Sequence, residues 1–416
     1  MIRLFVVADD VTGALDTGVK FAVSGIPTKI ITDIKYDFSK MDPSMKVLVM
    51  DAGTRHLTLQ AAYDTVYDVV RRAVAVGIPF IYKKTDSALR GNIGSELTAA
   101  LKASGETMLT FLPAYPSMAR TTIGGVQYLE GIPIHETVFG QDPFEPVYCS
   151  YIPKIIKLQS EIPVRVIKLK EHFKPQKENG ICVFDCETRE DLYRIASELN
   201  NEGVLRIMAG CAGLAGVLPE VLGLRGIPTA EPKLHHPLLV VSGSVNEISQ
   251  KQLFYAENNG FKRVTLTPEQ KLEPAFLDST EGEVLFQSVR VLCGENSPLI
   301  IDTNDMFSKT ATVDYARKHN ISNEQVRVRI TNTLGRILKA VVDAGIESTM
   351  LVSGGDILMG FMQQVDCREI IPVYEIESGV VYSQFQYQGK PFQIISKSGG
   401  FGNEQLLVSL AEKTKR

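Results

Sequence analysis

Short apolar runs recur in the first third of the chain, and each is followed by a polar loop. The first four runs span residues 4–8, 47–50, 79–82 and 108–112. Runs of this length, with helical spacing of apolar residues after most of them, predict buried parallel strands in βαβ units. Helices are predicted at residues 17–24, 57–76 and 93–103, each ending at a glycine suited to a helix C-cap. A strand at 181–185 and a helix at 189–199 continue the alternation.

Two stretches break this pattern. Residues 124–153 are rich in Gly and Pro and have weak periodicity, which predicts an irregular excursion. Residues 226–237 concentrate Pro, Gly and charge directly before a strong apolar run, which is typical of a linker between domains. We therefore expect a first domain at residues 1–230 and a second α/β domain at residues 231–416.

The second half repeats one local arrangement, an apolar strand that runs into a glycine turn and then a helix. The predicted strands are 238–241, 349–352 and 392–395, and the predicted helices are 247–258, 357–364 and 404–413. Glycine lets backbone N–H groups approach an oxyanion closely, and a helix N-terminus adds a favourable dipole. Three such turns on one sheet edge favour a nucleotide polyphosphate site, to which Lys397 adds positive charge.

The polar loops of the first half carry the candidate chemistry. The carboxyl ends of parallel strands share one edge of a sheet, and ligands bind in the crevice there. We therefore expect a set of acids, bases and one hydroxyl to converge, which suits a polyhydroxylated anionic small molecule. The set comprises Asp9, Asp10, Arg55, Lys83, Lys84, Asp86, Ser87 and Arg90.

Structural explanations compete with this interpretation. Asp9 or Asp10 alone is equally typical of a helix N-cap. Arg55 alone could form a surface salt bridge, which contributes little to stability. Residues 83–92 could be a solvated polar loop, although their place after a strand favours the crevice. In the functional interpretation, Arg55 clamps a carboxylate, Asp86 orients or deprotonates a hydroxyl, and the bases neutralise anionic groups.

Composition narrows the class of protein. The 416 residues carry a net charge of −4, so the overall charge gives no support for binding to nucleic acid. The six cysteines form no CxxC pair, and neither they nor the histidines show metal-ligand spacing, so we expect no protein-held metal site. No signal-peptide pattern or long apolar span occurs, which favours a cytoplasmic protein without a membrane partner. The chain also lacks GxxxxGK[ST] and GxGxxG, which argues against a P-loop protein and against a nucleotide-dependent oxidoreductase.

Six segments together resemble one known family, the four-carbon acid sugar kinases. They are residues 8–18, 83–94, 120–122, 242–244, 353–356 and 397–402, and they follow the family's order over nearly the whole chain. The lysine pair and the run Leu89-Arg90-Gly91-Asn92 are more similar to the D-threonate and D-erythronate kinases than to the 3-oxo-tetronate kinases. The chain departs from the family pattern at Ala88 and Ile357, where threonine is common.

The resemblance implies two α/β domains with mostly parallel sheets and an active site in the cleft between them. It implies that the first domain binds the acid sugar and the second binds ATP, with Mg²⁺ on the nucleotide. The implied reaction is phosphorylation of the 4-hydroxyl of D-threonate or D-erythronate in carbohydrate acid catabolism. A 3-oxo-tetronate 4-kinase and a non-catalytic sensor of sugar acids and nucleotides are the alternatives, and a homo-oligomer is compatible with the sequence.

The resemblance also assigns contacts by motif: Asp10, Arg55 and residues 83–86 to the substrate, and Ser244, residues 353–356 and Gly399 to ATP. With the residues expected at the strand ends, the candidate substrate contacts are Asp9, Asp10, Arg55, Lys83, Lys84, Thr85, Asp86, Ser87 and Arg90, and we expect Asp86 or Asp10 to be the catalytic base. With the residues of the glycine turns, the candidate nucleotide contacts are Ser244, Ser353, Gly354, Gly355, Asp356, Lys397, Gly399 and Gly400.

Overall fold

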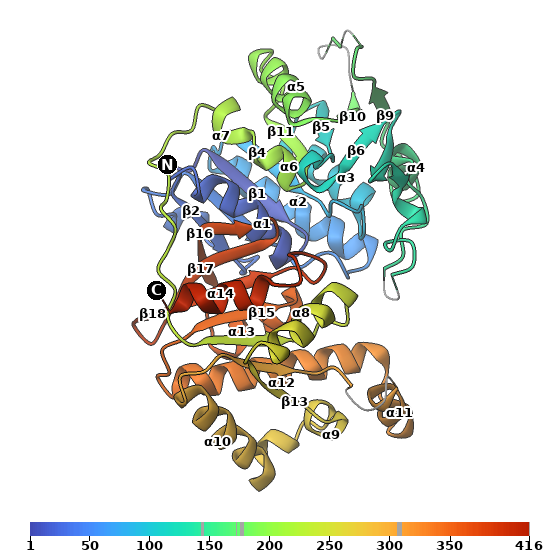
Figure 1. Ribbon diagram of the computed structural model, residues 1–416. Helices are drawn as coiled ribbons and strands as arrows, with labels where there is room; N and C mark the ends of the chain where they lie inside the picture. The colour runs from blue at the N-terminus through green and yellow to red at the C-terminus, as the bar shows by residue number, and fades with distance from the viewer. Residues whose placement is uncertain (143–144, 172, 175–178, 306–309, 416) are drawn as a thin grey trace. The chain divides into compact units, whose positions relative to one another are not determined.

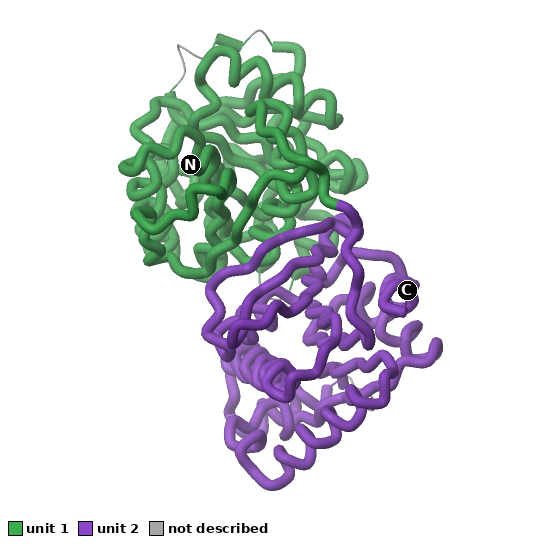
Figure 2. The backbone as a smooth tube through the Cα atoms, turned by 90° about the vertical axis from the view of Figure 1, so that its left-hand side faces the viewer, with its two compact units in different colours: residues 1–229 green, residues 230–416 purple. Residues whose placement is uncertain are grey.

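The structure is a computed structural model, and it describes residues 1–142, 145–171, 173–174, 179–305 and 310–415. It divides into two compact units, Met1–Thr229 and Ala230–Arg416, drawn in green and purple in Figure 2. Each unit has its own set of neighbouring strands and its own apolar core. The α/β class with mostly parallel sheets is confirmed.

Unit 1 is built around a parallel sheet, blue to green in Figure 1, with the strand order β2-β3-β1-β4-β11-β5-β10-β9. The strands are β1 (Leu4–Ala8), β2 (Thr28–Ile31), β3 (Val47–Asp51), β4 (Phe80–Lys84), β5 (Met108–Leu112), β9 (Val164–Ile167), β10 (Gly180–Phe184) and β11 (Ile207–Gly210). After β1 the chain continues to β2, toward one edge of the sheet, and after β4 it continues to β5, toward the other edge. The carboxyl ends of β1 and β4 therefore flank a topological switch point, where open α/β sheets bind ligands.

The helices of unit 1 form two packed groups. One group contains α2 (Leu59–Ala75), α3 (Ile93–Ser104) and α4 (Ile152–Lys157). The other contains α1 (Val11–Ala22), α5 (Arg189–Asn201), α6 (Ala212–Ala215) and α7 (Leu218–Val221). Apolar faces of α2 and α3 pack on strand residues such as Phe5 and Ile81, all nearly inaccessible to solvent. This burial of apolar side chains is the main force that holds helices on the sheet.

Three sequence-based predictions for unit 1 need correction. Helix α1 begins at Val11 rather than at residue 17, because Asp10 caps it directly after the strand. The glycines inside this helix lower its helix propensity, which weakens the prediction from sequence. The Asp10 cap in the turn after β1 stabilises the first turn of the helix. Strand β4 extends through Lys84, so both lysines lie in the strand and not in the loop after it.

Residues 124–153 are also more regular than predicted. They contribute to a small antiparallel sheet of β6 (Arg120–Ile123), β7 (Val126–Leu129) and β8 (Ile132–Pro133). Left-handed backbone at Gly124 and Gly125 makes the tight β6–β7 turn. Strands this short carry little periodicity, because their stability comes from pairing with one another.

Unit 2 has the strand order β13-β14-β12-β15-β18-β17-β16. Its strands are β12 (Leu238–Ser242), β13 (Lys262–Thr265), β14 (Leu299–Asp302), β15 (Thr349–Ser353), β16 (Glu369–Glu377), β17 (Val380–Tyr387) and β18 (Lys390–Lys397). The first five strands in the order run parallel, and β18, β17 and β16 run antiparallel. The chain leaves β12 and β15 toward opposite sides of the sheet, so unit 2 also has a switch point between them.

The helices of unit 2 cover its sheet in two groups. Helices α8 (Glu247–Asn258) and α14 (Leu406–Thr414) pack together, and their apolar residues join the main core of the unit. The second group comprises α9 (Pro268–Leu272), α10 (Thr280–Gly294), α11 (Ala311–Lys318), α12 (Asn323–Asp343) and α13 (Gly355–Gln364). Helix α13 begins two residues earlier than predicted, at the second glycine of its turn. Among the described residues, no helix has the length and apolar character needed to cross a bilayer.

Candidate functional site

The first candidate site lies at the switch point of unit 1, where β1, β3 and β4 are neighbours. Asp9 and Asp10 follow β1, Arg55 lies in the loop after β3, and Asp86 follows β4. In-register pairing sets Ala8 opposite both Asp51 and Lys84, so the three strands end at one level. The predicted convergence of these side chains therefore follows from strand register.

Arg55 is the centre of this site. Its Nε donates to Asp9 Oδ2 at 2.7 Å, its Nη1 lies 2.8 Å from Asp10 Oδ2, and its Nη2 lies 3.8 Å from Asp86 Oδ1. The Arg55 side chain is only 10% exposed. A planar guanidinium with several donors holds three carboxylates in a way that a lysine could not. Arg55 is therefore a buried organiser of the acids, in contrast to the surface salt bridge considered from sequence.

Asp86 is held by a second arginine. Arg90 donates from Nε and Nη2 to the two carboxylate oxygens of Asp86 at 2.8 and 3.0 Å. The backbone N–H groups of Ala88 and Arg90 also donate to Asp86 Oδ2. The neighbouring Ser87 hydroxyl accepts from Arg120 Nη1 at 2.7 Å. These bonds fix the loop after β4 tightly and occupy most lone pairs of Asp86.

The three acids differ in their affinity for a proton. Burial acts to raise the pKa of Asp86, but Arg90 and Arg55 outweigh it and hold that pKa well below its ordinary value. For Asp9, Arg55, Lys83 and Lys84 likewise overcome burial and lower the pKa. For Asp10, burial and the charge of Asp9 prevail over Arg55, so its pKa is raised. The best proton acceptor of the three is therefore Asp10.

Asp9 and Asp10 differ in their hydrogen bonds and in their exposure to solvent. Asp9 Oδ1 is buried and has no hydrogen-bond partner among the described residues. Asp10 Oδ1 accepts from the backbone N–H of Gly13 at 2.8 Å, so Asp10 is also the N-cap of α1. Its side chain is 25% exposed, more than that of Asp9 or Asp86. Asp10 thus caps α1 through one oxygen and contacts Arg55 through the other.

The lysine pair and Thr85 do not share one environment. Lys83 Nζ lies 2.8 Å from Glu96 Oε2 of α3, and both side chains are almost fully buried. Lys84 Nζ lies beside Gly13, because a Cβ built on that glycine would be 2.7 Å from it. The Thr85 hydroxyl donates to Gly210 O at the end of β11. Lys84 Nζ and Asp10 Oδ1 both lie beside Gly13 in the first turn of α1, while the charges of Lys83 and Lys84 both act on Asp9.

The second candidate site lies at the switch point of unit 2. The turn after β12 and the turn after β18 touch, since a Cβ built on Gly399 would lie 2.9 Å from Ser244 Oγ. Ser249 Oγ of α8 donates to Gly399 O at 2.6 Å, which holds the second turn against α8. Lys397 Nζ donates to the carbonyls of Ser398 and Gly399. Burial lowers the pKa of Lys397 to about 8.

The turn after β15 completes this second site. Gly354 has a φ of +118°, which side chains other than glycine rarely adopt, and its N–H donates to Lys397 O. Ser353 Oγ is buried and has no hydrogen-bond partner among the described residues. Asp356 stands at the start of α13, and Arg327 Nη1 of α12 lies 2.9 Å from it. Ile357 packs under Gly243, so this departure from the family pattern fills apolar space.

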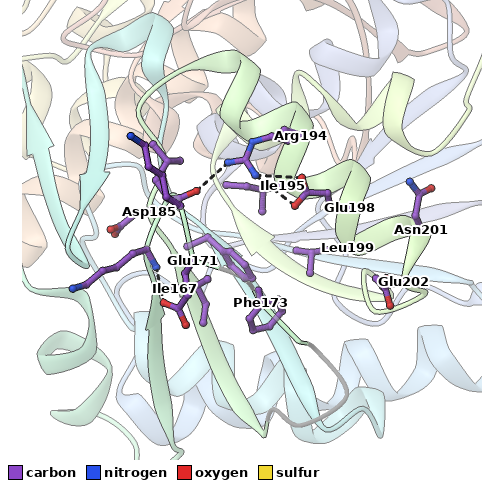
Figure 3. A pocket seen from close by; sticks show the side chains of 14 residues that line it. Ile167, Glu171, Phe173, Asp185, Arg194, Ile195, Glu198, Leu199, Asn201 and Glu202 are labelled. Carbon is purple, nitrogen blue, oxygen red and sulfur yellow. Dashed lines mark hydrogen bonds and ion pairs between the residues drawn. The ribbon is translucent and has the colours of Figure 1, made fainter.

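A separate hollow lies at the β9 edge of unit 1 (Figure 3). Apolar residues of β9, β10 and α5 line it together with several charged residues. These charged residues pair locally, as in the bonds of Arg194 to Glu198 and to Leu169 O (Figure 3). None of the residues predicted to bind substrate or nucleotide lines it.

Comparison with known proteins agrees with this division. Residues 4–218 match a family model described as a sugar-binding N-terminal domain, and residues 239–407 match a nucleotide-binding C-terminal domain. A D-threonate kinase from Salmonella typhimurium is 28% identical over 98% of this chain and 97% of its own. The chain belongs to the four-carbon acid sugar kinase family.

Other members of the family match over similar lengths. A D-erythronate kinase from Heliobacterium modesticaldum is 26% identical and covers 97% of this chain and 95% of its own. A 3-oxo-tetronate kinase from Brucella melitensis is 23% identical, with 97% and 94% covered. Since the chain spans nearly the whole of these kinases, it is a phosphotransferase with an alcohol acceptor.

Solved structures share the fold of the family. A protein from Salmonella typhimurium LT2 has a TM-score of 0.81 at 21% identity, covering 99% of both chains. A Haemophilus influenzae protein has a TM-score of 0.71 at 20% identity, covering 98% of this chain and 99% of its own. These likenesses concern the fold alone.

Sequence reasoning assigned no supporting role in the sites to several residues, although Asn92 and Arg120 lie in segments that it had singled out. Glu96, Asn92 and Arg120 support the acid-sugar kinase loops of unit 1, and Ser249 and Arg327 support the turns of unit 2. Asn92 occupies the N-cap position of α3 but makes no capping bond, because its amide donates to Thr54 O and Leu57 O. Glu96 had one local signal, an acidic residue in the first turn of a buried helix. The others depend on contacts between distant segments.

Proposed function

We propose that this protein transfers the γ-phosphoryl group of ATP to the terminal 4-hydroxyl of a four-carbon sugar acid, D-threonate or D-erythronate. The observation that carries the proposal is the cluster of Asp9, Asp10, Arg55, Lys84 and Asp86 at one switch point. Such a cluster offers acceptors for several hydroxyls together with cations for a carboxylate. The names of the relatives support the choice of acid.

The acids of unit 1 have separate roles in this proposal. Asp10 accepts the proton of the attacking hydroxyl, since its pKa is raised by burial and its carboxylate is the most exposed of the three. Asp9 Oδ1, buried without a partner among the described residues, accepts a hydrogen bond from a substrate hydroxyl. Asp86 keeps its charge and orients Arg55 and Arg90. The hydroxyl oxygen attacks the γ-phosphorus, the bond to ADP breaks, and the proton moves to Asp10.

The remaining polar residues of the loop after β4 bind or support the substrate. Arg90 and Ser87 lie in this loop, and in this proposal they complete the set of donors around the acid sugar. Thr85 anchors the loop to β11 through both its N–H and its hydroxyl. This fixed frame favours transfer, because phosphoryl-transfer enzymes work mainly by positioning and charge stabilisation.

Unit 2 binds ATP in this proposal. The polyphosphate lies on the turns that contain Ser244, Ser353–Gly355 and Gly399–Gly400, with Lys397 as a nearby cation. Mg²⁺ bound to phosphates keeps several waters and needs only one or two carboxylates from the protein. Asp356, whose side chain is 46% exposed at the start of α13, fits this need. Mg²⁺ would supply neutralisation of the phosphate charge.

The proposal is tested by ADP release from Mg-ATP against a panel of acids. The panel is D-threonate, D-erythronate, L-threonate, L-erythronate and the 3-oxo acids of the alternative activity. We expect turnover with D-threonate or D-erythronate at the highest kcat/KM. Highest turnover with a 3-oxo acid would assign the alternative kinase activity instead. No turnover with any acid, together with measurable binding of ATP and acid, would favour the sensor.

A further inference from the structure

Lys83 and Lys84 are adjacent in β4, yet their side chains make different contacts. Successive residues of a strand point to opposite faces of the sheet. Lys83 meets α3 through Glu96, whereas Lys84 meets the first turn of α1 at Gly13. Although the sequence groups them as one basic pair, they belong to different layers of unit 1.

Lys83 forms a buried ion pair, and its charge also acts on the nearby Asp9. Its Nζ lies 2.8 Å from Glu96 Oε2 and donates to Lys84 O at 2.6 Å, and its side chain has no solvent exposure. Removing two charges from water is costly, and a buried ion pair often contributes no more stability than apolar residues of similar size. Stability alone is therefore a weak reason for this pair. Its contacts instead link two segments that carry site residues.

The pair joins two segments that carry site residues. Through Lys84 O, Lys83 holds the point where β4 passes into the loop with Asp86. Through Glu96, it holds α3, whose preceding residue Asn92 donates to Thr54 O and Arg55 O in the loop after β3. The backbones that carry Asp86 and Arg55 are thus tied to one another through α3.

Lys84 is left with its charge available. Its Nζ donates to Thr85 O at 2.9 Å, and it forms no ion pair within 4.0 Å among the residues that the structure describes. It is nevertheless only 4% exposed and influences the pKa values of Asp9, Asp10 and Asp86. A buried ammonium that forms no ion pair bears an uncompensated desolvation cost, which an anionic ligand beside it would offset.

We propose that Lys84 binds an oxyanion of the reacting ligands, and that Glu96 with Lys83 is a positioning pair that aligns Lys84 and the acids without touching substrate. This inference rests on the proposed kinase function and refines the roles of its residues. The oxyanion is either the carboxylate of the acid sugar or the transferred phosphoryl group. Both offer the same negatively charged oxygens to an ammonium.

The test compares K84M, E96Q and the double variant K83M/E96L with the parent protein. K84M should fold normally and lose ~100-fold or more in kcat/KM, as expected for loss of a group that stabilises developing charge. Calorimetry with the acid sugar alone separates the two ligands. Lost binding assigns Lys84 to the carboxylate, and retained binding with a lower kcat assigns it to the phosphoryl group. Parent-like kcat/KM in K84M would overturn its role.

Glu96 should act on KM for the acid sugar. Loss of a supporting partner typically costs ~10–100-fold, so E96Q should raise this KM by about tenfold and leave KM for ATP unchanged. A merely structural residue would reduce the folded fraction, and hence apparent kcat, at constant KM. That outcome, or a folded K83M/E96L variant as inactive as K84M, would overturn the positioning pair.

Melting temperatures separate failure of this inference from failure of the kinase proposal. K83M and E96L alone should melt well below the parent, since each leaves one buried charge unpaired. The double variant should recover most of that loss. This coupling is measurable even if the parent phosphorylates no acid of the panel, and its absence would refute the pair on its own.

Discussion

At the scale of single residues, proton affinity separates acids that look alike in sequence. Asp10 and Asp86 both follow strands and both lie near Arg55. Asp86 also receives two bonds from Arg90 and two from backbone N–H groups, so it remains a carboxylate at low pH. Asp10 receives one backbone N–H bond and one arginine contact, and burial with the charge of Asp9 raises its pKa. We therefore assign the base to Asp10 and an orienting role to Asp86.

Asp10→Asn is the variant that tests this assignment. Asparagine keeps the oxygen that caps α1, so the fold should persist, while loss of the base should lower kcat by ~10²–10⁴-fold. In the parent, kcat should fall as the pH drops through the raised pKa of Asp10, because the base must be deprotonated. The exposed Asp64→Asn is the matched control. A D10N variant that retained parent kcat or the same acidic limb would refute Asp10 as the base.

Asp51 provides a prediction about stability. Burial, reinforced by Asp10, raises its pKa to about 7. Between the unfolded pKa of about 3.9 and that value, the folded protein holds a proton that the unfolded chain has released, so stability falls as the pH rises. Asp51→Asn removes this titration and keeps the bond to the Gly53 N–H.

Melting curves at about pH 5 and about pH 8 measure this effect. The melting temperature of D51N relative to the parent should be higher at the alkaline pH than at the acidic one. The control D64N should show no such trend. An equal difference at both pH values would show that the Asp51 carboxyl does not titrate in this window.

At the scale of elements, strand register explains why each site exists. β1, β3 and β4 end at one level in unit 1, and β12, β15 and β18 do so in unit 2. Each switch point therefore collects loops from strands that are far apart in sequence. The turn after β18 depends in addition on α8, because Ser249 and Gln252 hold the Gly399–Asn403 segment by side-chain hydrogen bonds.

Lys397 should make nucleotide binding sensitive to alkaline pH. Burial lowers its pKa to about 8, so its ammonium, which holds the carbonyls of Ser398 and Gly399, loses a proton above that pH. We expect KM for ATP to rise above about pH 8, and K397M to show a raised KM at every pH. The exposed Lys251→Met on α8 is the control. A pH-independent KM for ATP in the parent would contradict a role for the Lys397 charge.

At the scale of the whole molecule, two units with separate cores should respond to two ligands separately. Hydrogen exchange of the full chain with Mg-ATP should protect residues 242–258, 353–364 and 397–406. The acid sugar should protect residues 9–22, 54–58 and 83–97. Protection should follow ligand contacts, because local opening must precede exchange at these loops.

The variants provide controls for this mapping. K84M should lose protection by the acid sugar if it binds the carboxylate, and it should keep protection by Mg-ATP. K397M should weaken protection by Mg-ATP alone. Protection of the first set of peptides by the acid sugar without nucleotide would reverse the assignment of ligands to units.

Much of the fold could be predicted because its information is local. Apolar runs of four or five residues, glycine stops and the following helical spacing predict the strands that end at the two sites and the helices that follow them. Other elements were not predicted, among them β2, β9, β11, β13, β14 and the helices α9–α12. Helix α1 was predicted to start too late because its glycines weaken the helical pattern, and the short strands β6–β8 and the β16–β17 hairpin exist through pairing with one another, which leaves a weak local pattern.

The sequence by itself determined which residues reach the two sheet edges and which family the chain resembles. Strand ends and glycine turns depend on neighbouring residues, so position along the chain is enough to find them. Only the tertiary structure decided the partner of each charge. Lys83 and Lys84 are adjacent in sequence, yet Glu96 of α3 neutralises one, and the other faces α1. Such pairing depends on how helices pack across the two faces of the sheet, and packing brings together residues that no local pattern connects.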